Sequence, residues 1–333
     1  NQENLGFSRA NNIAIRRSQS KYVLLLNPDT MVGEDTIRQT IAFMDSHERA
    51  GALGVKMLNT DGSVAKESRR GIPSPATAFY KMCGVCERFP ANRTFAHYYM
   101  SYLPWNEASK IEIVSGAFCL LRKSRLEDVG LLDEDFFMYG EDIDLSYRIH
   151  NKGWDVWYYP TEILHYKGES TQKTSFRYVH VFYEAMLIFF NKHYSHLSFL
   201  FSLPIQMAIY SKALSTLISV KMSKFYSTFK NEKLKVAAPI SYICVVPMEN
   251  RELCNKIASA NGLDPNYITD LGDIEYNELN ETALTYIIYD VSAFALQQIF
   301  KSATSSAHPR VKMGFFNPLS HTIIKKKNVF NDK

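Results

Sequence analysis

The chain has 333 residues, of which 46% are hydrophobic and 22% are charged, a composition typical of a globular protein that buries a sizeable core. This length exceeds that of most single domains, so we expect a large domain and a smaller one. A net charge of +4 is too small to indicate a nucleic-acid partner, and we expect none. The five cysteines are an odd number in mostly apolar surroundings, which favours reduced thiols in a cytoplasmic protein over a disulfide framework.

The first part of the chain alternates helical and strand patterns. Apolar spacing predicts helices over residues 8–19 and 35–46, and unbroken apolar runs predict buried strands over residues 21–26 and 52–58. A strand, a helix and a second strand in this order imply a right-handed parallel crossover. Ligands of open α/β sheets bind at the carboxyl ends of the strands, where residues 27–30, "NPDT", follow the first strand. We therefore predict an α/β fold with a mostly parallel sheet and flanking helices.

The middle of the chain is less regular. Residues 69–110 are rich in Arg, Pro and Tyr, which predicts a loop-rich segment with short helices. Beyond it we expect strands at residues 111–114, 118–122 and 154–159 and helices at residues 124–129 and 141–151. These elements would complete a first domain over residues 1–177.

Residues 178–236 have a different character. Aromatic, nearly uncharged runs are followed by lysines, and Pro204 interrupts the apolar run before it reaches the ~20 residues of a membrane span. Two interpretations stay open: helices that lie on a membrane surface with a basic flank, or a helical hairpin packed on the rest of the protein. Residues 237–333 contain the buried-strand runs "ISYICVV" and "ALTYIIYD" but no glycine-rich phosphate loop, so we expect a small α/β domain of unknown role.

Two acidic stretches are candidates for chemistry. In "FFMYGEDIDLSYR", Glu141 and Asp142 begin a predicted helix. Acids are common there because they face the positive end of the helix dipole, but the pair would also suit a catalytic carboxylate beside an aromatic pocket. In "NPD", Asp29 follows a buried strand and is either a turn cap or a ligand of a divalent cation that bridges two phosphates. The local patterns do not separate these alternatives.

Seven motifs give these acids a context. In chain order they are "NLGFSRANNIAI", "YVLLLNPDT", "DGS", "SGAFCLLRK", "GLLDEDFFMYGEDIDLSYR", "GWDVWYYP" and "HYKGES". Together they strongly resemble family-2 glycosyltransferases of the GT-A fold, and within that family the rhamnosyltransferase-like and galactofuranosyltransferase-like enzymes of bacterial surface polysaccharides. The resemblance covers about residues 1–171 and does not extend to residues 237–333.

The resemblance implies a role for each matching residue. Asp29 matches the last acid of the family's metal motif, Asn27 stands where its first acid often stands, and His165 matches a histidine that completes the metal site. Asp142 matches the catalytic base, and Glu141 matches its acidic neighbour near the acceptor. The first motif and the matched loops add the expected substrate-binding residues Asn12, Asp61, Ser115, Gly116 and Ala117.

The resemblance implies sugar transfer from a nucleoside-diphosphate sugar to a saccharide acceptor, which we expect to be lipid-linked. Mg²⁺ or Mn²⁺ would stabilise the leaving diphosphate as a Lewis acid, and an imidazole from His165 would tilt the preference towards Mn²⁺. One base without a candidate nucleophile predicts a single displacement, hence inversion at the anomeric carbon. We expect a peripheral protein on the inner face of a bacterial cytoplasmic membrane, and we leave a homo-oligomer open.

The sequence also departs from the family. The strand and loops that grip the nucleotide base upstream of "NLGF" are absent from it, so we expect weak donor binding by this chain alone. The alternative is therefore a catalytically impaired, glycosyltransferase-like binding or scaffold protein. Asp29, Asp142 and His165 argue against that alternative, because a scaffold has no physical need for all three.

Overall fold

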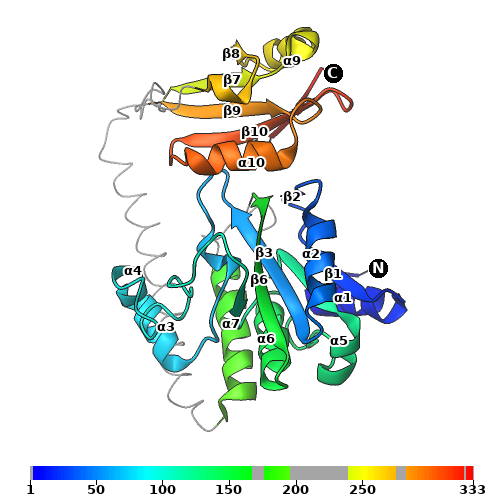
Figure 1. The fold of residues 1–333 in the computed structure, drawn as a ribbon, viewed down its shortest axis with the longest axis vertical. Coiled ribbons are helices and arrows are strands. Elements are labelled where there is room, and N and C mark those ends of the chain that lie inside the picture. The colour runs from blue at the N-terminus through cyan, green and yellow to red at the C-terminus, as the bar shows by residue number, and fades with distance from the viewer. Residues whose placement is uncertain (1–2, 167–175, 196–238, 275–282, 326–327, 333) are drawn as a thin grey trace.

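The computed structural model describes residues 3–166, 176–195, 239–274, 283–325 and 328–332. The strands form two sheets, and the sheet from the later part of the chain stands at one end of the sheet from the earlier part (Figure 1). We call the described residues up to residue 195 the N-terminal unit and residues 239–332 the C-terminal unit. The boundaries of the three predicted domains stay a prediction.

The first sheet has the strand order β1, β5, β3, β6, β2, with β4 paired to β6 beside this path. Its strands are β1 (Tyr22–Leu26), β2 (Thr30–Val32), β3 (Ala50–Leu58), β4 (Ser109–Ile111), β5 (Phe118–Arg122) and β6 (Asp155–His165). The helices of this unit are α1 (Gly6–Arg17), α2 (Thr36–Ser46), α3 (Pro75–Met82), α4 (Val85–Arg88), α5 (Lys123–Val129), α6 (Glu141–Asn151) and α7 (Phe176–His193).

Strand direction in the first sheet differs in part from the prediction. Among the strand pairs that the structure describes, β3 and β6 are parallel, while β1–β5, β3–β5, β2–β6 and β4–β6 are antiparallel. Because β5 lies between β1 and β3, the predicted crossover joins two strands of the same direction that are not neighbours. The carboxyl ends of β1, β3 and β6 therefore still face one edge of the sheet.

The two central strands explain how the sheet reaches that edge. All nine residues of β3 are buried, as expected for an apolar run that is covered on both faces. Its partner β6 continues past residue 159, where we predicted its end, to His165. Pro160 has no N–H to donate, and a register shift between Val55 and Lys56 of β3 accommodates it as a bulge. The strand then resumes and carries His165 to the sheet edge.

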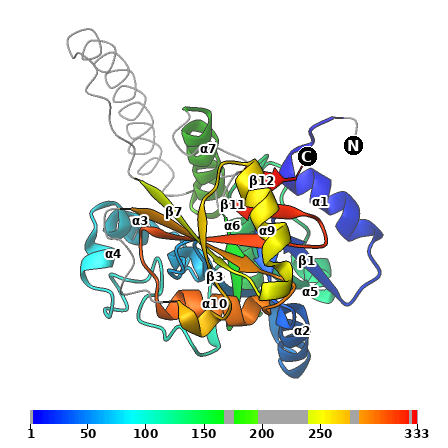
Figure 2. The ribbon, with the colours of Figure 1, turned by 90° about the horizontal axis from the view of Figure 1, so that it is seen from above.

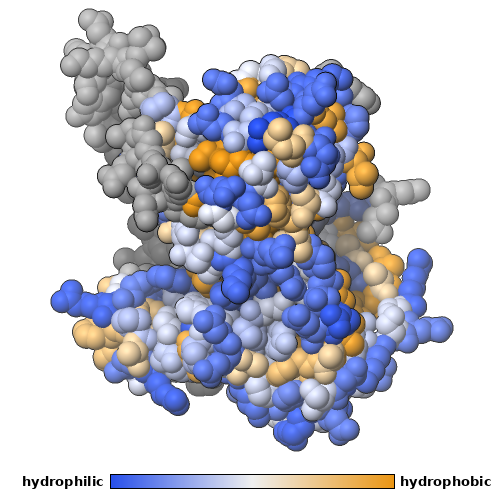
Figure 3. Space-filling view, turned by 45° about the horizontal axis from the view of Figure 1, so that its top comes forward, coloured by the Kyte–Doolittle hydropathy of each residue, from blue (hydrophilic) through white to orange (hydrophobic). Residues whose placement is uncertain are grey.

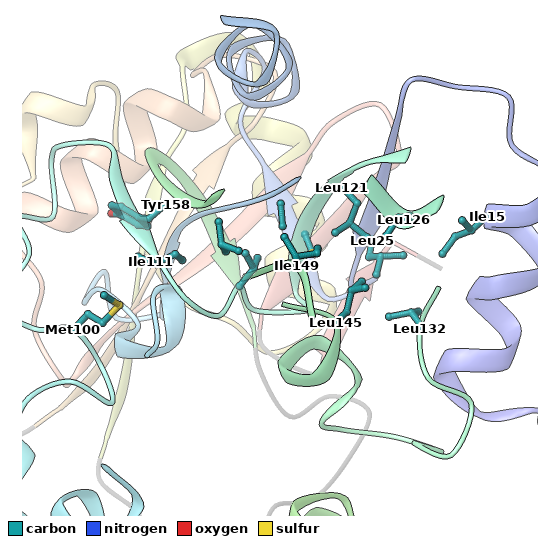
Figure 4. Packing of buried hydrophobic residues seen from close by; sticks show 14 residues of the cluster. Ile15, Leu25, Met100, Ile111, Leu121, Leu126, Leu132, Leu145, Ile149 and Tyr158 are labelled. Carbon is teal, nitrogen blue, oxygen red and sulfur yellow. The ribbon is translucent and has the colours of Figure 1, made fainter. Parts of the chain in front are cut away.

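Apolar side chains cover both faces of this sheet. One cluster packs among the sheet, α1, α5 and α6 and includes Ile15, Leu121 and Ile149 (Figure 4). The other contains Met44 of α2 and Leu120. Neighbouring residues of β5 thus enter different clusters, because side chains alternate between the two faces of a strand. The predicted mixed α/β fold is confirmed.

The second sheet has the strand order β12, β11, β10, β9, β7, β8. Its elements are β7 (Ile240–Val245), α9 (Met248–Ala260), β8 (Pro265–Ile268), β9 (Leu284–Asp290), α10 (Leu296–Ser305), β10 (Val311–Asn317), β11 (Thr322–Lys325) and β12 (Asn328–Asn331). The strands β8, β7, β9 and β10 are mutually parallel, and β11 and β12 extend the sheet antiparallel. For these residues we predicted only a small α/β domain, without a strand direction. The helices α9 and α10 cover opposite faces, and α10 lies between the two sheets (Figures 1 and 2).

The segment predicted to lie on a membrane is described in part. Its beginning forms α7, which packs on α6, with His193 Nε2 lying 2.7 Å from Asp144 Oδ1. The longest apolar run and the following lysines fall within residues 196–238, outside the described residues. None of the helices in the described ranges combines the length and the apolar character that crossing a membrane requires.

Candidate active site

A pocket of about 620 Å³ lies at the edge of the first sheet where β1 and β6 end. Eight of the ten predicted site residues line it, namely Asn27, Asp29, Ser115, Gly116, Ala117, Glu141, Asp142 and His165. They come from the turn after β1, the turn before β5, the start of α6 and the end of β6. Tertiary structure therefore gathers segments that are far apart in the sequence.

Backbone pairing brings Asp29 and His165 together. Thr30, the first residue of β2, is opposite His165 in the β2–β6 ladder. The next residue along β6, Tyr166, donates its N–H to the carbonyl oxygen of Asp29 at 2.9 Å. As a result, His165 Nε2 lies 3.2 Å from Asp29 Oδ1, and the two side chains are 13% and 15% exposed. Their convergence is what the resemblance predicted.

These side chains fit a divalent cation. A carboxylate and an imidazole form a donor set that Mn²⁺ accepts, and carboxylates also suit Mg²⁺. The amide nitrogen of Asn27 lies 3.4 Å from His165 Nε2, so Asn27 borders the same spot. The described residues contain no group of three or more His, Cys, Asp or Glu side chains able to hold a metal ion. Asp29 and His165 would hold such an ion together with further oxygen ligands, which a diphosphate and water can supply.

Asp142 lies across the pocket at the start of α6. Its Oδ2 accepts hydrogen bonds from the Gly116 N–H at 3.0 Å and from Arg70 Nη2 at 2.6 Å. The bond from the Gly116 N–H ties the Ser115-Gly116-Ala117 turn to Asp142, and a Cβ at Gly116 would make only an ordinary contact with the Asp142 Cβ, at 3.5 Å. The start of α6 is thus fixed against the turn that precedes β5.

Arg70 is a site residue that the sequence reasoning missed. It lines the pocket, its side chain is 14% exposed, and it donates to the carbonyl oxygen of Val114 at 2.9 Å as well as to Asp142. The sequence "ESRRGIP" places two adjacent arginines in a segment predicted to be irregular. A basic residue in such a loop was the available signal, but nothing local indicated its partner.

Glu141 is the buried member of the acidic pair. It is 7% exposed, and its Oε2 finds no hydrogen-bond partner among the described residues. Burial raises the pKa of Glu141 to about 8, and the neighbouring charge of Asp142 adds to the shift. At neutral pH Glu141 is therefore mostly protonated, so it can donate a hydrogen bond into the pocket. The two adjacent acids thus have different chemistry, because one is paired with Arg70 and the other is buried.

Asn12 lies outside the pocket described above and makes contacts within the fold, and its predicted part in substrate binding stays a prediction. It is 1% exposed on α1. Its amide donates to the carbonyl oxygen of Leu132 at 2.8 Å and to Glu134 Oε1 at 2.9 Å, and its Oδ1 accepts from the Leu132 N–H at 3.1 Å. These bonds fasten α1 to the loop after α5 and occupy the whole amide group.

Asp61 also does not line the pocket described above. Its Oδ1 accepts from the Ser63 N–H at 3.1 Å, and its Oδ2 lies 3.0 Å from Lys312 Nζ of the C-terminal unit. Asp61 therefore stabilises a turn and a contact between the two units, and its assignment as a substrate-binding residue stays a prediction.

Comparison with known proteins gives matches to enzymes of sugar transfer. Residues 1–180 match the family described as "Glycosyltransferase like family 2". The N-acetylglucosaminyl-diphospho-decaprenol L-rhamnosyltransferase of Mycobacterium tuberculosis is 32% identical over 176 residues, which cover 52% of this chain and 56% of that protein. The low-salt glycan biosynthesis hexosyltransferase Agl10 of Haloferax volcanii is 26% identical over 157 residues, which cover 46% of each.

Further similarities are more limited. The poly-beta-1,6-N-acetyl-D-glucosamine synthase of Staphylococcus aureus is 27% identical over 160 residues, which cover 48% of this chain and 33% of that protein. The chain thus spans about half the length, or less, of these curated relatives. The crystal structure of GalNAc-T7 with UDP, GalNAc and Mn²⁺ aligns over 54% of this chain and 35% of that chain, with 16% identity and a TM-score of 0.36, too low to support an inference. The family match ends before the C-terminal unit begins.

Proposed function

Because the chain belongs to glycosyltransferase-like family 2, we propose that its pocket transfers a sugar from a nucleoside-diphosphate donor to a saccharide acceptor, with inversion at the anomeric carbon. The observation that carries this proposal is the convergence of Asp29 and His165 with Asp142 and Glu141 in one pocket. Asp29 and His165 fit a divalent ion, and Asp142 and Glu141 are two acids in different surroundings. Such a set suits proton transfer next to a phosphate leaving group.

In the proposed reaction, the acceptor hydroxyl oxygen attacks the anomeric carbon of the donor. Its proton passes to the carboxylate of Asp142 as the new carbon–oxygen bond forms, and the bond from the anomeric carbon to the diphosphate breaks. A divalent ion, when bound, supplies Lewis-acid stabilisation of the leaving diphosphate. Asp29 and His165 would hold that ion, with Mn²⁺ favoured by the imidazole.

Two further side chains are proposed to orient this chemistry. Arg70 and the Gly116 N–H both contact Asp142 Oδ2, so they fix the carboxylate in one orientation. Protonated Glu141 would donate a hydrogen bond to an acceptor oxygen, because its buried Oε2 faces no other described partner. Positioning of this kind lowers the barrier by avoiding reorganisation during the reaction.

The nature of the acceptor and the place of the protein are proposed from the relatives. The Mycobacterium tuberculosis relative is named for a diphospho-decaprenol substrate, which supports a lipid-linked acceptor and an L-rhamnosyl or related donor for this chain. A lipid-linked acceptor is presented at a membrane surface, so we keep the proposal of a peripheral location on the inner face of the cytoplasmic membrane.

The test is a transfer assay with a panel of nucleoside-diphosphate sugars, a polyprenyl-diphosphate saccharide and Mn²⁺ or Mg²⁺. With a donor that is turned over, Asp142→Asn should reduce transfer by roughly 10²–10⁴-fold, as expected for loss of a positioned base. Asp135→Asn is the matched control, since this acid is 67% exposed shortly before α6. Retention of more than about a tenth of the activity in Asp142→Asn would contradict the assignment. Donor binding without transfer to any acceptor would favour a binding protein.

A further inference from the structure

The C-terminal unit contacts the loops at the carboxyl edge of the first sheet. Lys312 Nζ lies 3.0 Å from Asp61 Oδ2, and the Met313 N–H donates to the carbonyl oxygen of Thr60 at 2.7 Å. In a second contact the N–H of Leu296, the first residue of α10, donates to Glu34 Oε1 at 2.7 Å. Figure 3 shows one face of the molecule, on which hydrophilic and hydrophobic residues are interspersed.

The same boundary has an apolar core. Leu58 at the end of β3 and Leu164 near the end of β6 are both 0% exposed, and they share one hydrophobic cluster with Phe300 of α10 and Phe315 of β10. Met31 of β2 packs against this cluster. A continuous core of this kind is typical of a fixed contact and not of two freely moving domains.

Residues of this boundary are direct neighbours of the proposed metal pair. Met31 is opposite Leu164 in the β2–β6 ladder, one step from the pair of Thr30 and His165. On the other side, Tyr166 donates its N–H to the Asp29 carbonyl, and its ring centroid lies 6.4 Å from that of Phe315. Side chains before and after His165 on β6 therefore reach the C-terminal unit.

We propose that the C-terminal unit is a positioning element of the transferase, which holds β2 and the end of β6 in the register that keeps Asp29 and His165 together. This inference rests on the proposed function of that pair as a metal site. The short strand β2 has three residues and pairs with β6 alone among the described strands, so its ladder by itself holds it weakly. Packing of Met31 and Tyr166 on the C-terminal unit supplies the remaining restraint.

Two glycines allow this close approach and offer a way to test it. Gly62 has φ +77°, and a Cβ there would stand 2.2 Å from the carbonyl oxygen of Ala303 in α10. A Cβ on Gly33 would stand 2.8 Å from Cγ of Gln297, also in α10. In Gly62→Ala the new methyl group would clash with backbone atoms of Ala303. In Gly33→Ala the flexible side chain of Gln297 can move aside.

The decisive comparison is Gly62→Ala against Gly153→Ala in the whole protein. Gly153 has φ +79°, and a Cβ there meets nothing within 4 Å, so both variants carry the strain of a left-handed residue but only one separates the units. We expect hydrogen exchange of the amides in residues 30–32 and 161–166 to quicken about tenfold in Gly62→Ala relative to Gly153→Ala. The Mn²⁺ concentration needed for half-maximal transfer should rise by a similar factor, and kcat should fall by a smaller factor.

Gly33→Ala is the milder variant for the case in which Gly62→Ala does not fold. Gln297→Ala removes the Cγ that the new Cβ would meet, so the double variant should restore exchange and Mn²⁺ dependence, a rescue that general destabilisation would not show. Exchange in both strands equal to that of Gly153→Ala would overturn the inference. Because exchange is measured without turnover, a protein that transferred no sugar would contradict the proposed function and leave the exchange result readable.

Discussion

Asp29 and Asp290 both stand where a strand ends, one in each sheet, yet their surroundings differ. Asp29 follows β1, faces the pocket and has His165 Nε2 at 3.2 Å. Asp290 ends β9 and is 0% exposed. Its Oδ2 accepts from the Asn250 amide at 2.7 Å, and its Oδ1 accepts from the N–H and Oγ of Ser292 at 2.9 and 2.6 Å. One aspartate is open to a ligand, and the other is closed by neutral neighbours.

This difference teaches that the end of a strand is a place for chemistry only when the protein leaves acceptor atoms there without internal donors. The three bonds to Asp290 join the first turn of α9 to the turn after β9 and so stabilise the C-terminal unit. In the N-terminal unit the corresponding edge gathers Asp29 and His165 on one side and Glu141 on the other, around a pocket. The edge in the N-terminal unit suits ligand binding, whereas the edge in the C-terminal unit stabilises the fold.

The largest effect on the comparison is expected when Asp29 or His165, the proposed metal pair of the N-terminal unit, is removed. Asp29→Ala and His165→Ala should each reduce metal-dependent transfer by at least about a hundredfold, because each removes one of the two side chains that we assign to the ion. The melting temperature should change little, since both side chains border a pocket instead of filling a core. The measurement is transfer rate against Mn²⁺ concentration, with thermal unfolding of the same samples.

The pair can also fail this test in a recognisable way. If His165→Ala lowered the melting temperature strongly and left the Mn²⁺ dependence unchanged, His165 would be a buried structural histidine. Ser20→Ala, an exposed change before β1, is a control that should alter neither quantity. Agreement of the two variants in their metal dependence would show that both residues act on one ion.

Local signals in the sequence predicted much of the fold. The helix expected at residues 141–151 is α6, because Gly140 before it and Lys152-Gly153 after it mark both ends. The run at residues 21–26 forms β1, but the predicted burial was wrong, because most of this strand is only half-buried and Leu26 is 42% exposed. In contrast, β10 and the last part of β6 were missed. Their strand character depends on pairing with β9 and with β2 and β3, partners that lie elsewhere in the chain.

The site shows the same limit. Most of the residues assigned from the motifs lie in one pocket. Their motifs are at strand ends or at a helix start, which the fold brings to the same edge of the first sheet. The contacts of Asn12 and Asp61 outside the pocket could not be predicted because their partners Leu132 and Lys312 are 120 and 251 residues away in the sequence. Arg70 was missed for the same reason, since its partner Asp142 is 72 residues away. Side-chain pairing over such distances leaves no local pattern.

Asp290→Ala should have the opposite effect to Asp29→Ala. It removes the hydrogen bonds that the fully buried Asp290 carboxylate accepts from the Asn250 amide and from Ser292, and at about 1 kcal/mol for each bond the unfolding free energy should fall by about 1–3 kcal/mol. Below the transition, the specific activity and the Mn²⁺ constant should stay near those of the parent protein. Urea unfolding combined with the transfer assay measures both. A loss of Mn²⁺ dependence without a loss of stability would mean that Asp290 takes part in ligand binding after all.

The smallest predicted effect concerns Glu141 and sharpens the comparison, because this acid is buried like Asp290 but lacks its donors. The pKa of Glu141 is raised from the usual 4.5 to about 8, first by burial and then by the charge of Asp142. Between pH 4.5 and about 8 the folded state keeps a proton that the unfolded state has lost, so the unfolding free energy of the parent protein falls as pH rises through this window.

Glu141→Gln removes this dependence while keeping the shape of the side chain. The variant and the parent should be about equally stable near pH 4, and the variant should be more stable by about 1 kcal/mol or more at pH 8.5. Urea unfolding at a series of pH values measures the difference, and Glu127→Gln, at an exposed position of α5, is the matched control that should follow the parent protein. A difference that stayed constant with pH would show that Glu141 is ionised in the folded protein, and it could then not donate the hydrogen bond that we assign to it.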